Sequence, residues 1–147
     1  MVLTQNKFLT FLLGEEIYGI SVLKVKEIIG LMSITPVPRM PASIRGVINL
    51  RSKIIPVMDL RQKFGMGQNP YHDHTCIIIT ENRLASGNRL MGLVVDSVSE
   101  VVVILEDAIE PLVTSSDEKS WVLLSGIVKT QDKIILLVNT DRILNQE

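Results

Sequence analysis

Short apolar runs separated by glycine, proline and polar clusters recur along the whole chain. The first two runs, at residues 8–13 and 17–20, flank Gly14, Glu15 and Glu16, which is the pattern of a strand, a turn and a second strand. The same pattern continues to the C-terminus. It predicts strands at 8–13, 17–20, 27–29, 46–50, 54–57, 75–80, 90–95, 100–104, 121–128 and 134–139.

Polar residues predict the helices and connections. Ser21 is a candidate cap for a short helical turn that ends near Lys24, and Asp59 is a candidate cap for a short helix that runs to Phe64. The three prolines between residues 35 and 41 predict an extended surface crossing outside the hydrogen-bonded ladders. The remaining predictions are a linker at 66–74, a polar loop at 82–88, a long polar connection to about residue 120 and a last short helix at 141–145.

Two blocks of sequence occur twice, in the same order and without gaps. Residues 19–29 align with 92–102, and residues 46–55 align with 126–135. Repetition of this kind indicates a duplicated structural unit, and frequent turns between short strands are typical of small barrels. The sequence therefore predicts a mainly β fold of two packed five-stranded β-barrels with short helices.

The repeat also predicts how the chain is divided. The first barrel repeat covers about 7–70 and the second about 74–147, and the N-terminal strand is a candidate for sharing between them. A unit of roughly 60–70 residues buries only a thin core by itself. We therefore expect the two barrels to pack against each other, so that residues 1–147 form a single domain.

Composition narrows the function classes. Hydrophobic residues make up 46% of the chain and aromatic residues only 4%, so the apolar content is mostly aliphatic and suits strands. Lys and Arg number 15 against 16 Asp and Glu, which argues against a nucleic-acid partner. Cys76 cannot form an internal disulfide, and no apolar run approaches the roughly 20 residues that cross a bilayer, so a cytoplasmic protein is expected.

One cluster suggests metal chemistry. His72, Asp73, His74 and Cys76 lie within five residues, and histidines at i and i+2 can share an ion on one face of a strand. A metal-dependent enzyme centred on His72 and His74 is therefore the alternative function. Against it, both histidines lie in the predicted linker, and the chain has neither a phosphate-binding loop nor a G-x-S-x-G motif. The sequence predicts no catalytic residue, no cofactor and no metal ligand.

Arg51 is the residue that distinguishes the two halves. Its counterpart in the second copy is Gln131, whereas Glu27 is matched by Glu100. A residue present in one half alone is a candidate for a task that the other half lacks. Arg51 is either a solvated turn arginine or a positioned guanidinium, and we predict that it forms an ion pair with Glu27 at the barrel surface.

At these residues the chain resembles the CheW family of bacterial chemotaxis coupling proteins. The resemblance rests on residues 8–20, 22–28, 37–41, 44–51, 55–64, 92–101 and 124–127, in the family's order and spacing. It implies two intertwined SH3-like barrels and a non-enzymatic adaptor that bridges the cytoplasmic tip of a chemoreceptor, a methyl-accepting chemotaxis protein, to the regulatory domain of the histidine kinase CheA. The protein would be cytoplasmic, not inserted in the membrane, and recruited to receptor arrays.

The resemblance also implies a partner-binding surface. It assigns receptor and kinase coupling to Val25, Glu27, Gly46 and Arg51, and we expect a receptor helix to dock near Val25, Ile28, Ile48 and Arg51. One position departs from the family pattern: Ser52 follows Arg51 where a glycine is usual, which puts the turn geometry in question. The length of the chain favours a stand-alone coupling protein over a fragment of a kinase or of a CheV-type protein.

Overall fold

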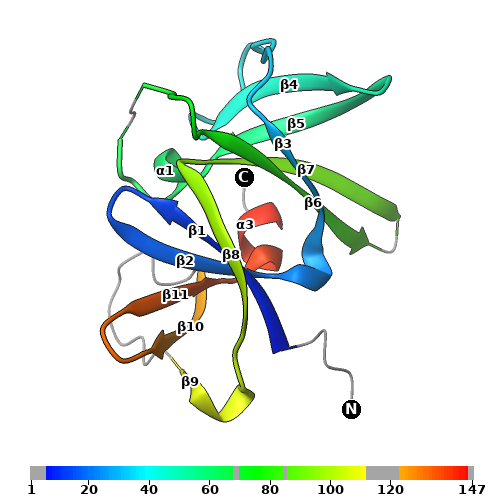
Figure 1. Cartoon of the computed structure of the whole chain (residues 1–147). Coiled ribbons are helices and arrows are strands. Elements are labelled where there is room, and N and C mark those ends of the chain that lie inside the picture. The colour runs from blue at the N-terminus through cyan, green and yellow to red at the C-terminus, as the bar shows by residue number, and fades with distance from the viewer. Residues whose placement is uncertain (1–5, 68–69, 85, 112–122, 146–147) are drawn as a thin grey trace.

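The computed structural model describes residues 6–67, 70–84, 86–111 and 123–145 (Figure 1). Strands dominate it, joined by short helical turns. The elements are β1 (Lys7–Leu13), β2 (Glu16–Ser21), η2 (Val22–Lys24), β3 (Val25–Gly30), β4 (Ile44–Leu50), β5 (Lys53–Asp59), α1 (Leu60–Lys63), β6 (Cys76–Leu84), β7 (Gly87–Val95), β8 (Ser97–Val103), η3 (Glu106–Ala108), β9 (Ile109–Glu110), β10 (Leu124–Lys129), β11 (Ile134–Val138) and α3 (Thr140–Asn145).

The strands form two sheets, and each sheet takes strands from both halves of the sequence. One sheet has the order β8-β1-β2-β11-β10-β9, and the other has the order β3-β6-β7-β5-β4. The colours of Figure 1 show this mixing, because blue strands lie beside orange and yellow-green ones. Strand pairing therefore crosses the boundary predicted near residue 70. The mainly β fold with two small sheets and short helices is confirmed.

The two sheets repeat each other's pairings at the positions that the sequence repeat makes equivalent. β11 runs parallel to β2 with Leu137 opposite Gly19, and β5 runs parallel to β7 with Val57 opposite Gly92. β8 pairs with β1 just as β3 pairs with β6. The first hairpin of each half, β1–β2 or β6–β7, therefore lies in one sheet with the later strands of the other half. The repeated blocks therefore occupy matching places in the two sheets.

Among the described residues, buried side chains form three groups. One lies within the five-stranded sheet and a smaller one within the six-stranded sheet. The largest group draws on β1 and β2 of one sheet, on β6 and β7 of the other, and on α1 and α3, so it joins the two sheets. Its fully buried members include Phe11, Leu13, Ile20, Leu60, Ile78, Leu93 and Ile143.

The predicted caps are present. The Ser21 side chain accepts a hydrogen bond from the Leu23 amide at the start of η2. Asp59 Oδ1 accepts from the Arg61 amide at 2.9 Å at the start of α1, and its Oδ2 accepts from the Tyr71 hydroxyl at 3.1 Å. Because the carboxylate has two acceptor atoms, it ties the helix to the loop that follows.

Two predictions from the sequence are corrected, one for residues 82–88 and one for the connection after residue 104. Residues 82–88 were expected to be a polar loop, but β6 continues to Leu84 and β7 begins at Gly87. Backbone ladder bonds stabilise this hairpin extension, so it needs no apolar side chains. The second correction concerns the polar connection after residue 104, which contains η3 and β9. Residues 121 and 122 of the predicted strand 121–128 lie outside the described residues.

Candidate functional site

Glu27 and Arg51 form the ion pair that the sequence predicts. Arg51 Nη2 donates to Glu27 Oε2, and the Arg51 side chain stays 67% exposed against 29% for Glu27. Glu27 lies on β3, and Arg51 lies in the turn between β4 and β5. Since β3 and β4 are the two outer strands of the five-stranded sheet, the pair links the ends of that sheet.

The turn that carries Arg51 has two central residues with positive φ. Arg51 has φ 49° and Ser52 has φ 70°, between Leu50 and Lys53, which pair across the hairpin. Positive φ at both centres identifies a type I′ turn, whose twist matches that of the flanking strands. Ser52 therefore adopts the same turn that a glycine would form with less strain. The Arg51 side chain projects from the tip of the hairpin, where its guanidinium contacts Glu27.

The other candidate residues divide into exposed and buried ones. Ile28 is 44% exposed on β3, and Val25 is half-buried against the large core group. Ile48 is 1% exposed and packs inside the five-stranded sheet with Ile55 and Val57. Strand alternation turns the Ile48 side chain inward, so this predicted partner-binding residue offers no exposed side chain of its own.

Gly46 contributes through its backbone. It is buried, its φ is 144°, and a Cβ there would lie 2.1 Å from the carbonyl oxygen of Thr35. Thr35 and Val47 exchange two backbone hydrogen bonds of 2.8 and 2.9 Å, which hold the proline-containing segment against β4. Sequence reasoning placed this segment outside the ladders and missed the bridge at Thr35; the glycine that allows it is the only signal in the sequence.

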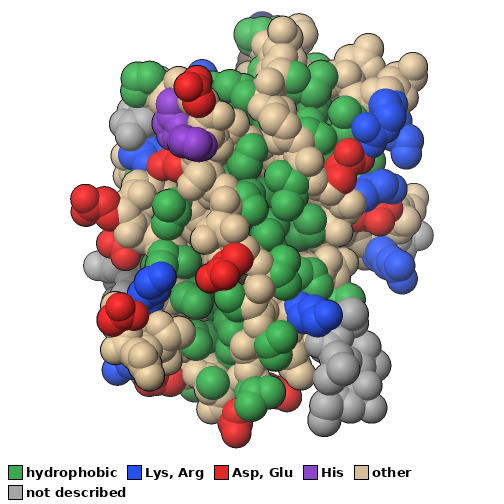
Figure 2. Space-filling model, in the orientation of Figure 1, with side chains coloured by type: hydrophobic (Ala, Val, Ile, Leu, Met, Phe, Trp, Pro, Cys, Tyr) green, Lys and Arg blue, Asp and Glu red, His purple; other side chains and the backbone are tan. Residues whose placement is uncertain are grey.

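Exposed apolar side chains continue from Ile28 into the segment that Thr35 anchors. Leu31 is 39% exposed, Val37 38% and Met40 44%. Figure 2 shows hydrophobic side chains running over the middle of one face of the molecule. Several large apolar side chains exposed close together in the sequence are a feature of interaction sites when they also gather in space. The ion pair and this surface together suit protein recognition better than bond-making chemistry.

Comparison with known proteins identifies the family of this chain. Residues 7–147 match the model of the CheW-like domain. The chain belongs to the CheW family. It is 36% identical over 142 residues to the chemotaxis protein CheW of Klebsiella aerogenes, with 97% of this chain and 83% of the relative covered. It is 31% identical over 144 residues to the chemotaxis protein CheW of Bacillus subtilis, with 98% and 91% covered.

A solved CheW structure shares the fold. The scaffolding protein TtCheW from Thermoanaerobacter tengcongensis superposes with a TM-score of 0.80 at 39% sequence identity, covering 92% of this chain and 84% of that one. The resemblance inferred from the sequence is therefore confirmed, and so is the prediction of a non-enzymatic chemotaxis adaptor. The CheW-family fold is the SH3-like arrangement that the two sheets display.

The alternative of a metal-dependent enzyme finds no support. The backbone amide of His74 donates to His72 Nδ1 at 3.1 Å, so that ring nitrogen already has a partner. Burial raises the pKa of the Cys76 thiol, which disfavours the thiolate that binds metal. Within residues 6–67, 70–84, 86–111 and 123–145, no group of three or more His, Cys, Asp or Glu side chains is placed to hold an ion.

No helix of the described segments is long and apolar enough to cross a bilayer.

Proposed function

We propose that this CheW-family chain couples the cytoplasmic tip of a chemoreceptor to the regulatory domain of the histidine kinase CheA. Its place of action would be the cytoplasm, at receptor arrays. The observation that carries the proposal is the exposed Arg51 guanidinium, which a type I′ turn presents and which pairs with Glu27, the residue before the exposed Ile28 on β3. The second copy of the repeat has Gln131 in this place, so the arrangement belongs to one half.

Charge and geometry make Arg51 a specific contact. A guanidinium offers five donors in a planar fork, and Glu27 engages it at Nη2. With the side chain 67% exposed, other donors remain directed toward a partner. An ion pair this exposed adds only about 0.2–1 kcal/mol to folding stability. The ion pair therefore acts mainly by holding Arg51 in one orientation, because a pre-positioned side chain loses less conformational freedom on binding.

The apolar residues beside the pair suit a helix from the receptor. Amphipathic helices dock by placing side chains at i, i+3, i+4 and i+7 into an apolar surface. Val25 and Ile28 on β3 offer such a surface next to the charged pair, and Gly46 shapes it by letting the Thr35 segment lie close to β4. Kinase control would then be a shift between conformational states imposed through contacts, with no chemistry by this chain.

A reconstituted receptor, kinase and adaptor phosphorylation assay tests the proposal. We expect Arg51→Ala to lower receptor-dependent kinase activity while the urea midpoint changes little, because the pair contributes little to folding. Gln131→Ala at the repeat-equivalent position is the matched control and should behave as the unaltered chain. Arg51→Glu combined with Glu27→Arg restores an ion pair with its charges exchanged, so it should keep the urea midpoint of the unaltered chain without full coupling.

Several outcomes would contradict the proposal. Unchanged kinase activity with Arg51→Ala would remove Arg51 from the coupling surface. An equal loss with Gln131→Ala would show that the effect is not specific to this half. Failure of the unaltered protein to retain both a receptor tail and the CheA regulatory domain in a pull-down would refute the coupling model itself.

A further inference from the structure

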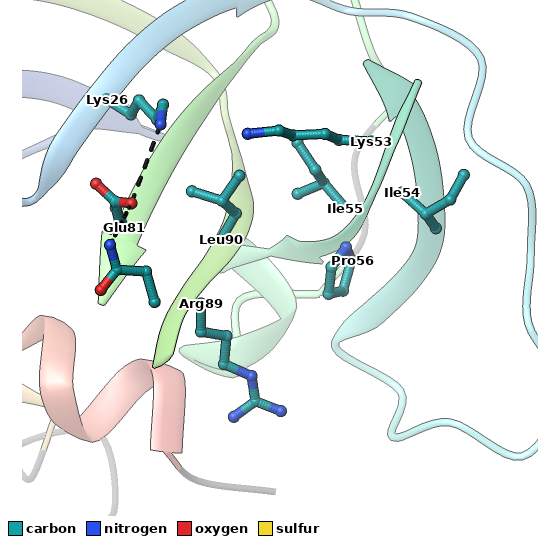
Figure 3. A pocket seen from close by; sticks show the side chains of 9 residues that line it. Lys26, Lys53, Ile54, Ile55, Pro56, Glu81, Arg89 and Leu90 are labelled. Atoms are coloured by element: carbon teal, nitrogen blue, oxygen red, sulfur yellow. Dashed lines mark hydrogen bonds and ion pairs between the residues drawn. The ribbon is translucent and has the colours of Figure 1, made fainter. Parts of the chain in front are cut away.

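A groove opens where β5 and β7 diverge. The two strands pair in parallel only through Val57–Asp59 and Gly92–Val94. Before that point, residues 53–56 of β5 pair with β4 alone and residues 87–91 of β7 pair with β6 alone, among the described strands. The space between them has a volume of about 640 Å³ and is shown in Figure 3. Two strand edges therefore face each other across a groove that neither fills.

The groove has an apolar floor and a largely basic rim. Leu90 on β7 faces Ile55 on β5 in Figure 3, and the neighbouring Ile54 is 64% exposed. The rim carries three cationic side chains and one carboxylate. These are Lys26, Lys53, Arg89 and Glu81.

The single carboxylate of the rim is already engaged. Glu81 Oε2 lies 4.0 Å from Lys26 Nζ and accepts a hydrogen bond from Asn88 at 3.1 Å. The rim therefore presents net positive charge, although the whole chain has a formal net charge of −1. Carboxylates brought to this rim would be attracted to it.

The described strands of the other half leave no room for an equivalent groove between β2 and β11. There, β2 begins at Glu16 and pairs with β11 from Ile17, so hardly any of β2 lies before the pairing. In contrast, β7 begins at Gly87 and meets β5 only at Gly92. The groove comes from the β6–β7 hairpin, which extends further than its repeat equivalent β1–β2. The duplicated scaffold does not itself require this extension, because only one half has it.

We propose that this groove binds an extended acidic peptide segment of a partner protein, which adds as a strand to the open edge of β7. An antiparallel ladder directs alternate backbone groups of a strand away from its partner, so the β7 edge offers donors and acceptors to an added strand. Pro56 lacks an N–H and weakens the facing β5 edge as a template. Apolar side chains of the peptide meet Leu90 and the exposed Ile54, and its carboxylates meet the lysines.

This binding site goes beyond the coupling role and does not depend on it. Its test uses the full isotope-labelled chain and a capped peptide in which Glu alternates with Val and Thr. We expect the peptide to shift the backbone amide signals of residues 87–91 and to slow their hydrogen exchange. Binding should weaken as salt rises, because the rim charges are exposed to solvent. A peptide with Lys in place of Glu should bind far less.

The repeat supplies a matched pair of variants. Lys53→Glu should weaken binding of the acidic peptide by roughly tenfold at low salt, since an attraction is replaced by a repulsion. Lys133 is the repeat-equivalent lysine, beside Ile134, which is 52% exposed. Lys133→Glu changes the net charge equally and should leave binding unchanged. Lys53→Gln, which removes the charge without reversing it, should give an intermediate affinity and serves as a second variant.

The outcomes separate clearly. Loss of binding with Lys53→Glu in a chain that keeps its dispersed amide spectrum supports the site. Equal weakening by Lys133→Glu would show a response to net charge only. Shifts confined to residues near Arg51, equal binding of the Lys peptide, or no binding of the acidic peptide would each overturn the proposal.

Discussion

Replacing Gly46 by alanine tests how the candidate surface is built. The added Cβ would lie 2.1 Å from the Thr35 carbonyl oxygen, 2.7 Å from its carbonyl carbon and 3.0 Å from Pro36 Cα. These are backbone atoms, which cannot rotate away as a side chain can. The φ of 144° is also one that L-residues rarely adopt.

The cost follows from these two effects. Holding a non-glycine residue in a sparsely populated backbone region costs about 1–3 kcal/mol. Separating the Thr35 segment from β4 breaks two backbone hydrogen bonds, at about 1 kcal/mol each. The smaller entropy of the unfolded alanine chain offsets about 0.4–1 kcal/mol. We therefore expect Gly46→Ala to lower the free energy of unfolding by about 3 kcal/mol.

Urea unfolding followed by circular dichroism measures this change. Gly30→Ala is the control, because nothing lies within 4 Å of a Cβ there. Gly126→Ala should be intermediate, since its Cβ meets the Ile109 side chain at 2.5 Å but its φ is not positive. A loss with Gly46→Ala below about 1 kcal/mol, or one equal to that of Gly30→Ala, would refute the reasoning.

Three further predictions concern the turn and two titrating groups. Ser52→Gly should stabilise the fold by about 1 kcal/mol by relieving the positive φ, and an unchanged or lower urea midpoint would contradict this. Burial and the Asp59 carboxylate raise the pKa of Tyr71 from 10.0 to about 12, so its contribution to stability is complete below pH 10 and is lost as pH rises toward 12. Tyr71→Phe should flatten that decline, measured by urea unfolding at several pH values. Burial raises the pKa of Cys76 above 9.0, so its alkylation rate in the folded chain should keep increasing with pH beyond 9, and a plateau reached below that pH would count against the assignment.

Much of the fold and of the candidate site followed from the sequence. The apolar runs located most strands, and Ser21 and Asp59 marked the starts of their helical turns because their side chains satisfy free amides there. The difference between Arg51 and Gln131 led to the ion pair with Glu27, which the structure contains. These features depend on local chemistry or on comparison of the two repeats, so the sequence is sufficient for them.

Other features were decided only when the chain folded. An alternating pattern shows that a strand has one buried face, but ladder hydrogen bonds use the backbone and so carry no record of which strand is the neighbour. The exchange of the hairpins β1–β2 and β6–β7 between the two halves was therefore not deducible, nor was the inward direction of Ile48. The same reason explains the missed hairpin at 82–88: its polar residues are held by β6–β7 pairing, and that pairing opens the groove beside β5.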